Sequence, residues 1–158
     1  MNAELDTYRR YLRDRIAAVP TALEGLSAAD LNRVPSFPGA NSLLVIATHI
    51  FGSTRSWVLG IVCGQDLQRD RPAEFAAQGT FAEVSLAARS LCDDIDKALS
   101  SLDPAVLDDR YTPAKQLWGE SEPYELMRRD GLAHMLEHAG MHLGHIDITR
   151  HWLEQHPG

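Results

Sequence analysis

Apolar side chains recur every three or four residues along the first part of the chain. This spacing predicts an amphipathic helix from about Ala3 to Gly25, which Pro20 should kink. Its apolar stripe contains Leu5, Tyr8, Leu12, Ile16, Val19, Leu23 and Leu26. A connector with the sequence "SAADLNRVPSFPGA" follows, and "SAAD" fits one short helical turn before the prolines break the chain.

A second helix is predicted from about Ser42 to Val62, where the chain is mostly apolar. Asn41 or Ser42 is a suitable N-cap for it, since either side chain can accept a hydrogen bond from the first turn. The stretch after it, "CGQDLQRDRPAEFAAQG", is polar and contains proline and glycine. We interpret this stretch as a loop, the kind of segment that carries function more often than a core does.

Two more helices are predicted in the second half of the chain. The third begins with a capping box formed by Thr80 and Glu83 and ends at Asp103 and Pro104. Its inner stripe contains Val84, Ala88, Leu91, Ile95, Ala98 and Leu102. After a second long connector, Ser121 or Glu122 ahead of Pro123 is the expected start of a fourth helix, which runs to about Glu154.

The fourth helix contains Gly131, Gly140 and Gly144, and each costs roughly 1 kcal/mol against alanine. Close approach of a neighbouring helix or of a ligand would offset that cost. Four amphipathic helices without a convincing strand favour an all-α fold, a four-helix bundle with long connectors after helices two and three. The length of 158 residues suits one domain spanning residues 1–158.

Composition places the chain among ordinary soluble proteins, with 44% hydrophobic and 23% charged residues. The longest apolar span, "SLLVIATHIF", has about ten residues against the roughly 20 of a membrane helix, and the N-terminus lacks a signal-peptide pattern. These features predict a cytoplasmic protein that does not enter the membrane. The net charge of −7, without a stripe of Lys and Arg, argues against a nucleic-acid partner.

Four of the seven histidines lie within twelve positions of the fourth helix. At about 100° per residue, His134, His138, His142 and His145 fall at roughly 0°, 40°, 80° and 20°, on one narrow face. Residues four apart on a helix have Cβ atoms about 6 Å apart, so two imidazoles can converge on one ion. Both His134 with His138 and His138 with His142 have this spacing.

A mononuclear metal site needs a further ligand from another element. His49 is the histidine outside the last helix and its tail, and it lies amid apolar residues in the middle of the second helix. A lone histidine there is more often a core residue, but a pair of histidines on a facing helix favours a ligand. The alternative of a di-iron carboxylate bundle requires paired E-x-x-H motifs, which the chain does not contain.

The segments "PGANSLLVIATHIFGSTRSWVLG" and "LEHAGMHLGHID" together resemble the DinB superfamily, which includes the metal-binding domain of mycothiol-dependent maleylpyruvate isomerase. The similarity extends over nearly the whole chain. The resemblance implies a four-helix bundle holding one divalent ion, with His49, His138 and His142 as its ligands. It also implies a homodimer, for which Trp118 and Trp152 would be interface candidates.

Two features depart from the family pattern. His145 stands where relatives commonly have glutamine, and His134 adds an imidazole one turn before His138. Either is a candidate fourth ligand, a group that orients a ligand, or a catalytic proton shuttle. The isomerase has a second domain that contributes to its substrate site, so its specific activity is not expected of this chain.

Three neutral imidazoles with open positions form the ligand set of a catalytic metal site. The ion, zinc or nickel in our prediction, would activate a bound water in a hydrolase or ionise a small thiol in an S-transferase. The resemblance favours a thiol-dependent S-transferase acting on a small electrophile. Trp57 and Ser53 are predicted to line the pocket that binds this thiol. A stress-associated metal-binding protein without catalysis is the third interpretation.

The two cysteines are not expected to take part in this chemistry. Cys63 and Cys92 are too few and too unpatterned for a disulfide scaffold or a cysteine-based zinc site. No arrangement of Ser, His and Asp suggests a built-in nucleophile, and no carboxylate is predicted beside the metal. The sequence therefore predicts a site whose nucleophile is supplied by a bound molecule.

Overall fold

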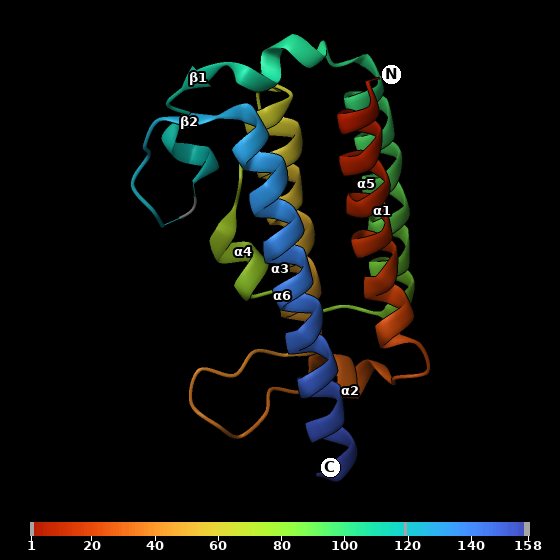
Figure 1. Cartoon of the computed structure of the whole chain (residues 1–158). Helices are drawn as coiled ribbons and strands as arrows, with labels where there is room; N and C mark the ends of the chain where they lie inside the picture. The colour runs from red at the N-terminus through yellow and green to blue at the C-terminus, as the bar shows by residue number, and fades with distance from the viewer. Residues whose placement is uncertain (1, 119, 157–158) are drawn as a thin grey trace.

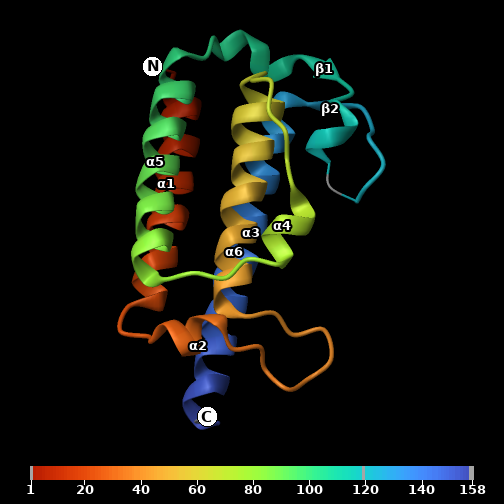
Figure 2. The ribbon, with the colours of Figure 1, turned by 180° about the vertical axis from the view of Figure 1, so that it is seen from behind.

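The computed structural model describes residues 2–118 and 120–156. Four long helical segments form an all-α bundle, as predicted (Figure 1). They are α1 (Ala3–Leu23), α3 (Leu43–Thr54) continued by η1 (Arg55–Val62), α5 (Phe81–Ser101) and α6 (Arg128–Gln155). Helix α1 packs against both α5 and α6, while α3 and η1 pack against α6. Seen from behind, α5 and α1 form one pair and α3 and α6 the other (Figure 2).

The stripe predicted for the first helix is the face of α1 that the bundle buries. Leu5, Leu12, Ile16, Val19 and Leu23 are all at most 1% exposed. Helix α1 continues through Pro20 and ends at Leu23, after which Gly25 adopts a φ of +82°. This left-handed conformation favours glycine, because it has no Cβ to clash with the backbone.

The second predicted helix has the expected limits but not the expected winding throughout. Ser42 caps α3 by accepting a hydrogen bond from the Val45 N–H at 3.2 Å. From Arg55 onward the backbone is a π-helix, and the Cys63 N–H donates to the Val58 carbonyl five residues earlier. The preceding connector contains the predicted short turn as α2 (Ala28–Asn32), capped by Ser27.

The interpretation of residues 63–79 as a plain loop was wrong for one segment. A short helix, α4 (Arg71–Phe75), begins behind an Asp70 cap with Pro72 in its first turn. Asp70 accepts a hydrogen bond from the Ala73 N–H at 2.9 Å, and proline tolerates this position because the first-turn N–H needs no helical partner. Helix α4 packs against α3, beside the half of the bundle formed by α3 and α6 (Figure 1).

The third predicted helix is confirmed as α5. The Thr80 hydroxyl accepts from the Glu83 N–H, and the Glu83 carboxylate accepts from the Thr80 N–H, which is the predicted capping box. Val84, Ala88, Leu91, Ile95 and Ala98 are buried along its inner face.

The predicted start of the fourth helix at Ser121 or Glu122 was wrong. Helix α6 begins at Arg128, because the preceding residues extend into a two-stranded antiparallel ladder. Strand β1 (Arg110–Tyr111) pairs with β2 (Leu126–Met127), and the Leu126 side chain is buried there. Pro123 therefore lies in the connector, and the side chain of Asp130 accepts from the Met127 N–H at the true helix start.

Only one of the three glycines of α6 has the predicted close neighbour. A Cβ at Gly131 would lie 2.9 Å from Val62 Cγ2, so the helix approaches η1 closely there. Added Cβ atoms at Gly140 and Gly144 would meet no described atom within 4 Å, so no neighbouring helix approaches there, and the alternative of a ligand stays a prediction.

One helical stretch, Leu43–Val62, is long and apolar enough to cross a membrane by length and composition. This helix is longer than the apolar span of about ten residues expected from the sequence. However, 83% of its most apolar window is buried inside the bundle, which is the pattern of a core helix in a soluble protein. Trp118 is also buried and Trp152 packs edge-on against Phe37, so neither side chain supports the predicted homodimer, which stays a prediction.

Candidate metal centre

Four of the five histidines of α6, His134, His138, His142 and His145, form a continuous row of rings along one face of the helix. The distances between successive ring centroids are 5.6 Å for His134 and His138, 4.4 Å for His138 and His142, and 5.0 Å for His142 and His145. This row follows directly from the helical spacing of the four residues.

His49 of α3 faces the middle of this row. Its ring centroid lies 5.1 Å from that of His138 and 4.9 Å from that of His142. The candidate ligand atoms of these three histidines all lie within 4.8 Å of one another. The packing of α3 against α6 thus brings together the three residues that the resemblance implied.

A buried carboxylate orients His49. The Nδ1 atom of His49 lies 2.9 Å from Oε2 of Glu74, a side chain of α4 that is only 7% exposed. With its Nδ1 proton donated to Glu74, His49 presents the lone pair of Nε2 to the other histidines. Such a carboxylate fixes the tautomer and the ring orientation of a metal-binding histidine.

Arg69 in turn holds Glu74. Its guanidinium donates from Nε to Oε1 at 2.8 Å and from Nη2 to Oε2 at 2.9 Å, and Nη2 also donates to Ser53 Oγ at 2.8 Å. Burial raises the pKa of Glu74, but hydrogen bonds from Arg69 and His49 outweigh this effect and leave it lowered. Glu74 is therefore ionised and can hold the His49 proton.

Glu74 fits against α3 because residue 52 is a glycine. A Cβ at Gly52 would lie 2.1 Å from Glu74 Oε1 and 2.5 Å from its Cδ, far inside van der Waals contact. The carboxyl group thus occupies the space that any larger side chain at this position would need.

The two candidate ligands on α6 are held neutral. Burial lowers the pKa of His138 to about 3, with further lowering by His142 and His49. Burial likewise lowers the pKa of His142 to about 4, with contributions from His49 and His145. A neutral imidazole has the lone pair that a metal ion requires.

The arrangement fits a divalent ion. The Nε2 atoms of His49 and His138 face each other at 3.2 Å. Two nitrogens that each lie about 2.0–2.1 Å from one tetrahedral ion are separated by ~3.3 Å. The chemistry of the ligand atoms is also compatible with a divalent ion. Three neutral imidazoles, one of them hydrogen-bonded to a carboxylate, suit zinc, nickel or a similar ion.

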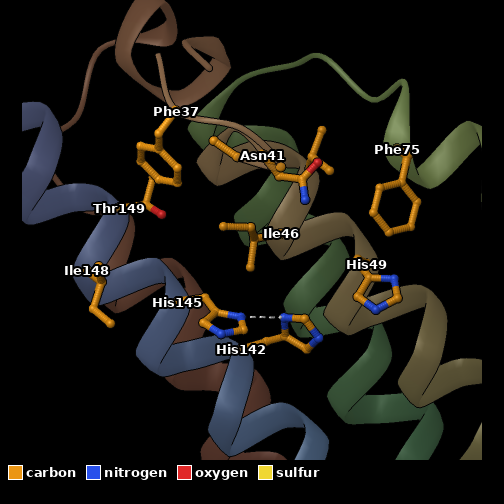
Figure 3. Close-up of a pocket in the computed structure, with 12 residues that line it drawn as sticks. Phe37, Asn41, Ile46, His49, Phe75, His142, His145, Ile148 and Thr149 are labelled. Atoms are coloured by element: carbon orange, nitrogen blue, oxygen red, sulfur yellow. Dashed lines mark hydrogen bonds between the residues drawn. The ribbon is translucent and has the colours of Figure 1, made fainter. Parts of the chain in front are cut away.

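A pocket of about 340 Å³ opens beside the centre and reaches His49, His142 and His145 (Figure 3). Its walls come from the connector between α2 and α3 and from α3, α4 and α6. The twelve lining residues are Phe37, Gly39, Ala40, Asn41, Val45, Ile46, His49, Phe75, His142, His145, Ile148 and Thr149. A small molecule in this pocket would contact an ion held by the three histidines.

Trp57 and Ser53, predicted to line the binding pocket, are not among these twelve residues. Trp57 is a core side chain, 8% exposed, that packs on Trp118 and on His134. Ser53 is buried and accepts the hydrogen bond from Arg69.

The two histidines flanking the candidate ligands lie in different surroundings. The His145 ring is exposed at the pocket, and its Nδ1 lies 3.2 Å from Nδ1 of His142 (Figure 3). His134 packs against Trp57 with ring centroids 4.1 Å apart, and burial lowers its pKa. His145 is therefore placed to exchange protons with the pocket, whereas His134 supports the far end of the row.

Sequence reasoning missed Glu74, Arg69 and the apolar walls of the pocket. The signal available for Glu74 was the Asp70 cap with Pro72, which indicates a short helix in the supposed loop. That signal would have predicted α4, but nothing in the spacing of the residues connects Glu74 with His49.

The stability of the metal-free protein is expected to fall as pH decreases below about 6.5. The pKa values of His138 and His142 are lowered in the folded state to about 3 and about 4, so the unfolded chain binds more protons between pH about 6.5 and about 3. The free energy of unfolding therefore has its full value above the unfolded pKa of about 6.5, and it decreases as the pH falls through this window. Chemical denaturation at several pH values measures it.

The double variant His138→Gln with His142→Asn should show a flatter dependence over the same range. The exposed His151 provides a control, since His151→Gln should keep the slope of the parent protein. An unchanged slope in the double variant would assign the effect to other groups.

Comparison with protein families identifies the chain through a match over most of its length. No curated protein matches the chain. The model of the DinB superfamily matches residues 11–146, a range that begins within α1 and contains α3, α5 and the five histidines from His49 to His145. The helical bundle and the clustered histidines agree with this match, and the chain belongs to the DinB superfamily.

Proposed function

We propose that the protein is a cytoplasmic, divalent-metal-dependent S-transferase, which joins a low-molecular-weight thiol to a small electrophile. His49, His138 and His142 hold the ion, zinc or nickel, in this proposal. The observation that carries it is the convergence of three imidazoles, two of which, His49 and His142, line an open and mainly apolar pocket. The position of the pocket beside these imidazoles supports catalysis rather than a closed structural site.

The chain's own cysteines do not supply the nucleophile. Burial raises the pKa of Cys63 to about 11, so this thiol is protonated at neutral pH. Cys92 is buried on α5, where its Sγ lies 3.9 Å from the Arg13 carbonyl. A nucleophilic sulfur would therefore come from a molecule that enters the pocket.

An ion bound to the three histidines would supply Lewis acidity that favours the ionised form of an incoming thiol. In the net reaction the S–H bond breaks, a C–S bond forms, and the leaving group departs with the electron pair of its bond to carbon. The released proton goes to His145, whose exposed ring lies at the pocket and can pass it to solvent or to the leaving group.

Glu74 is better suited to orienting His49 than to activating water. Both of its oxygens accept from Arg69, and Oε2 also faces His49. This occupied carboxylate disfavours the hydrolase alternative, in which a free carboxylate commonly acts as the base.

The test loads the purified protein with zinc, nickel or cobalt and supplies mycothiol, glutathione or cysteine with a neutral alkyl halide. We expect a thioether product by mass spectrometry, and a sulfur-to-metal charge-transfer band when the thiol is added to the cobalt form. His138→Ala should abolish both signals, while His151→Gln should retain them.

Two other results would replace this proposal. Metal-dependent ester or amide hydrolysis without any thiol effect on the cobalt spectrum would establish the hydrolase. Silence in both assays from a protein that retains its metal would favour a non-catalytic metal-binding role.

A further inference from the structure

The pocket beside the metal centre is distinguished by its lack of charge. Among its twelve lining residues, all of which the structure describes, none is Lys, Arg, Asp or Glu. Four other pockets of 280–420 Å³ are each lined by at least three such residues. The chain has 37 charged residues, of which 15 are basic and 22 acidic, so a pocket lined by none of them is unusual. A lining of this composition selects against charged ligands.

Three charged side chains beside His49 and Phe75, namely Arg69, Glu74 and Arg71, are already paired. Arg69 and Glu74 lie behind His49 and satisfy each other in a bidentate ion pair. Arg71 stacks over the Phe75 ring, with its guanidinium carbon 4.5 Å from the ring centroid, and pairs with Glu120. A ligand carboxylate or ammonium in the pocket would therefore find no Lys, Arg, Asp or Glu side chain among the lining residues to pair with.

Two phenyl rings form opposite walls of the pocket (Figure 3). Phe37 is fixed by an edge contact with Trp152 at 6.0 Å between centroids, and Phe75 by a tilted contact with His49 at 5.1 Å. Ile46 of α3 and the exposed Ile148 of α6 add apolar surface to the lining. Walls of this kind favour an aromatic or similarly flat apolar ligand.

Uncharged polar groups are present at two places on the walls. Asn41 reaches in from the connector before α3, and the largely buried Thr149 lies on α6. Each can form hydrogen bonds with a carbonyl, amide or hydroxyl group. The volume of about 340 Å³ corresponds to roughly eleven water-sized groups at ~30 Å³ each.

We propose that this pocket binds an uncharged, mainly apolar molecule of the size of a substituted benzene ring, as the electrophilic substrate of the site. The assignment as substrate rests on the proposed S-transferase function, whereas the binding preference rests on the pocket alone. Without the ion, electrophiles that carry a carboxylate or an ammonium group are disfavoured, because no Lys, Arg, Asp or Glu lines the pocket to pair with that charge.

The test titrates benzamide, benzamidinium and benzoate, which have the same shape and differ in charge, into the full-length protein. The methyl NMR resonances of isoleucine show where each ligand binds, because Ile46 and Ile148 line the pocket. Ile16 and Ile95 lie elsewhere in the core and serve as internal controls. Zinc-loaded and chelator-treated protein are both used, because removing the ion eliminates direct coordination of benzoate.

We expect benzamide to shift Ile46 and Ile148 in both forms. In the metal-free form, the two charged analogues should bind at least about tenfold more weakly. The inference is overturned if benzamide leaves Ile46 and Ile148 unshifted, or if either ion binds the folded metal-free protein as tightly as benzamide does.

A charge placed at the pocket mouth should change this preference. Ile148 is 69% exposed, so Ile148→Lys should fold, and it should strengthen benzoate binding while weakening benzamidinium binding. The matched control is Leu86→Lys on α5, where the parent side chain is 62% exposed, and it should leave all three affinities unchanged. Equal responses of the two variants would contradict a role for the pocket.

The binding results and the transferase assay fail independently. If benzamide binds as expected but no thioether forms with any thiol, the pocket assignment stands and the S-transferase proposal falls. If thioethers form equally well from neutral electrophiles and from matched ones with a distal carboxylate, the transferase stands and the inference about substrate charge falls.

Discussion

Replacing His49, His138 or His142 with alanine is expected to remove most of the bound metal from the purified protein. Each of the three supplies one of the ligand atoms that converge within 4.8 Å. Two remaining imidazoles cannot hold an ion as three do, so affinity should fall by more than the roughly 10–100-fold typical of an outer-shell change. Elemental analysis after dialysis and chelator competition measure the loss.

The flanking histidines provide the matched comparison. His134→Ala and His145→Ala should retain most of the metal, because His134 packs on Trp57 and His145 is exposed at the pocket. His151 and His156, beyond the row, should also be dispensable. If His134→Ala empties the site and His142→Ala does not, the ligand pair lies one turn earlier on α6 than proposed.

The second large effect is expected at Glu74, a residue outside the ligand set. Glu74→Gln keeps the size of the side chain but removes the charge that accepts from His49 and Arg69. We expect metal affinity to fall about 10–100-fold, the usual cost of losing the partner that orients a histidine ligand. Competition with a chelator of known affinity gives the dissociation constant of the folded protein.

A steric variant separates positioning from charge. Gly52→Ala would place a Cβ 2.1 Å from Glu74 Oε1, so it should displace the carboxylate and weaken metal binding in the same direction. Gly140→Ala is the control, because an added Cβ there meets no described atom within 4 Å, and alanine is the better helix former.

Stability must be measured alongside affinity for these variants. Breaking the buried pair of Glu74 and Arg69 can cost about 3–5 kcal/mol, since one charge is left without its partner. A cobalt spectrum that changes in Glu74→Gln while the helical signal is retained would show an effect on the metal rather than on folding. Unchanged metal affinity in folded Glu74→Gln and Gly52→Ala would refute the orienting role.

The helices were largely predictable because their signals are local. Leu12, Ile16 and Val19 repeat at helical spacing, and the Thr80–Glu83 capping box lies within one turn. The two errors, at the start of α6 and at α4, have different causes. The first arises from a contact between residues far apart in the chain, and the second from a segment with a weak local signal. The start of α6 moved to Arg128 because Leu126 pairs with Tyr111, fifteen residues earlier in the chain, and the five residues of α4 are too few to show a periodic stripe.

The sequence by itself determined the row of imidazoles on α6, because helical periodicity alone places His134, His138, His142 and His145 on one face. It also made His49 a candidate ligand, because a pair of histidines was expected on a facing helix, and the resemblance implied the same residue. Only the tertiary structure decided which residues surround these histidines. Glu74 reaches His49 across 25 positions of sequence through α4, and the walls of the uncharged pocket come from four separate segments. Such contacts depend on the path of the connectors and on helix packing, neither of which leaves a periodic signal in the chain.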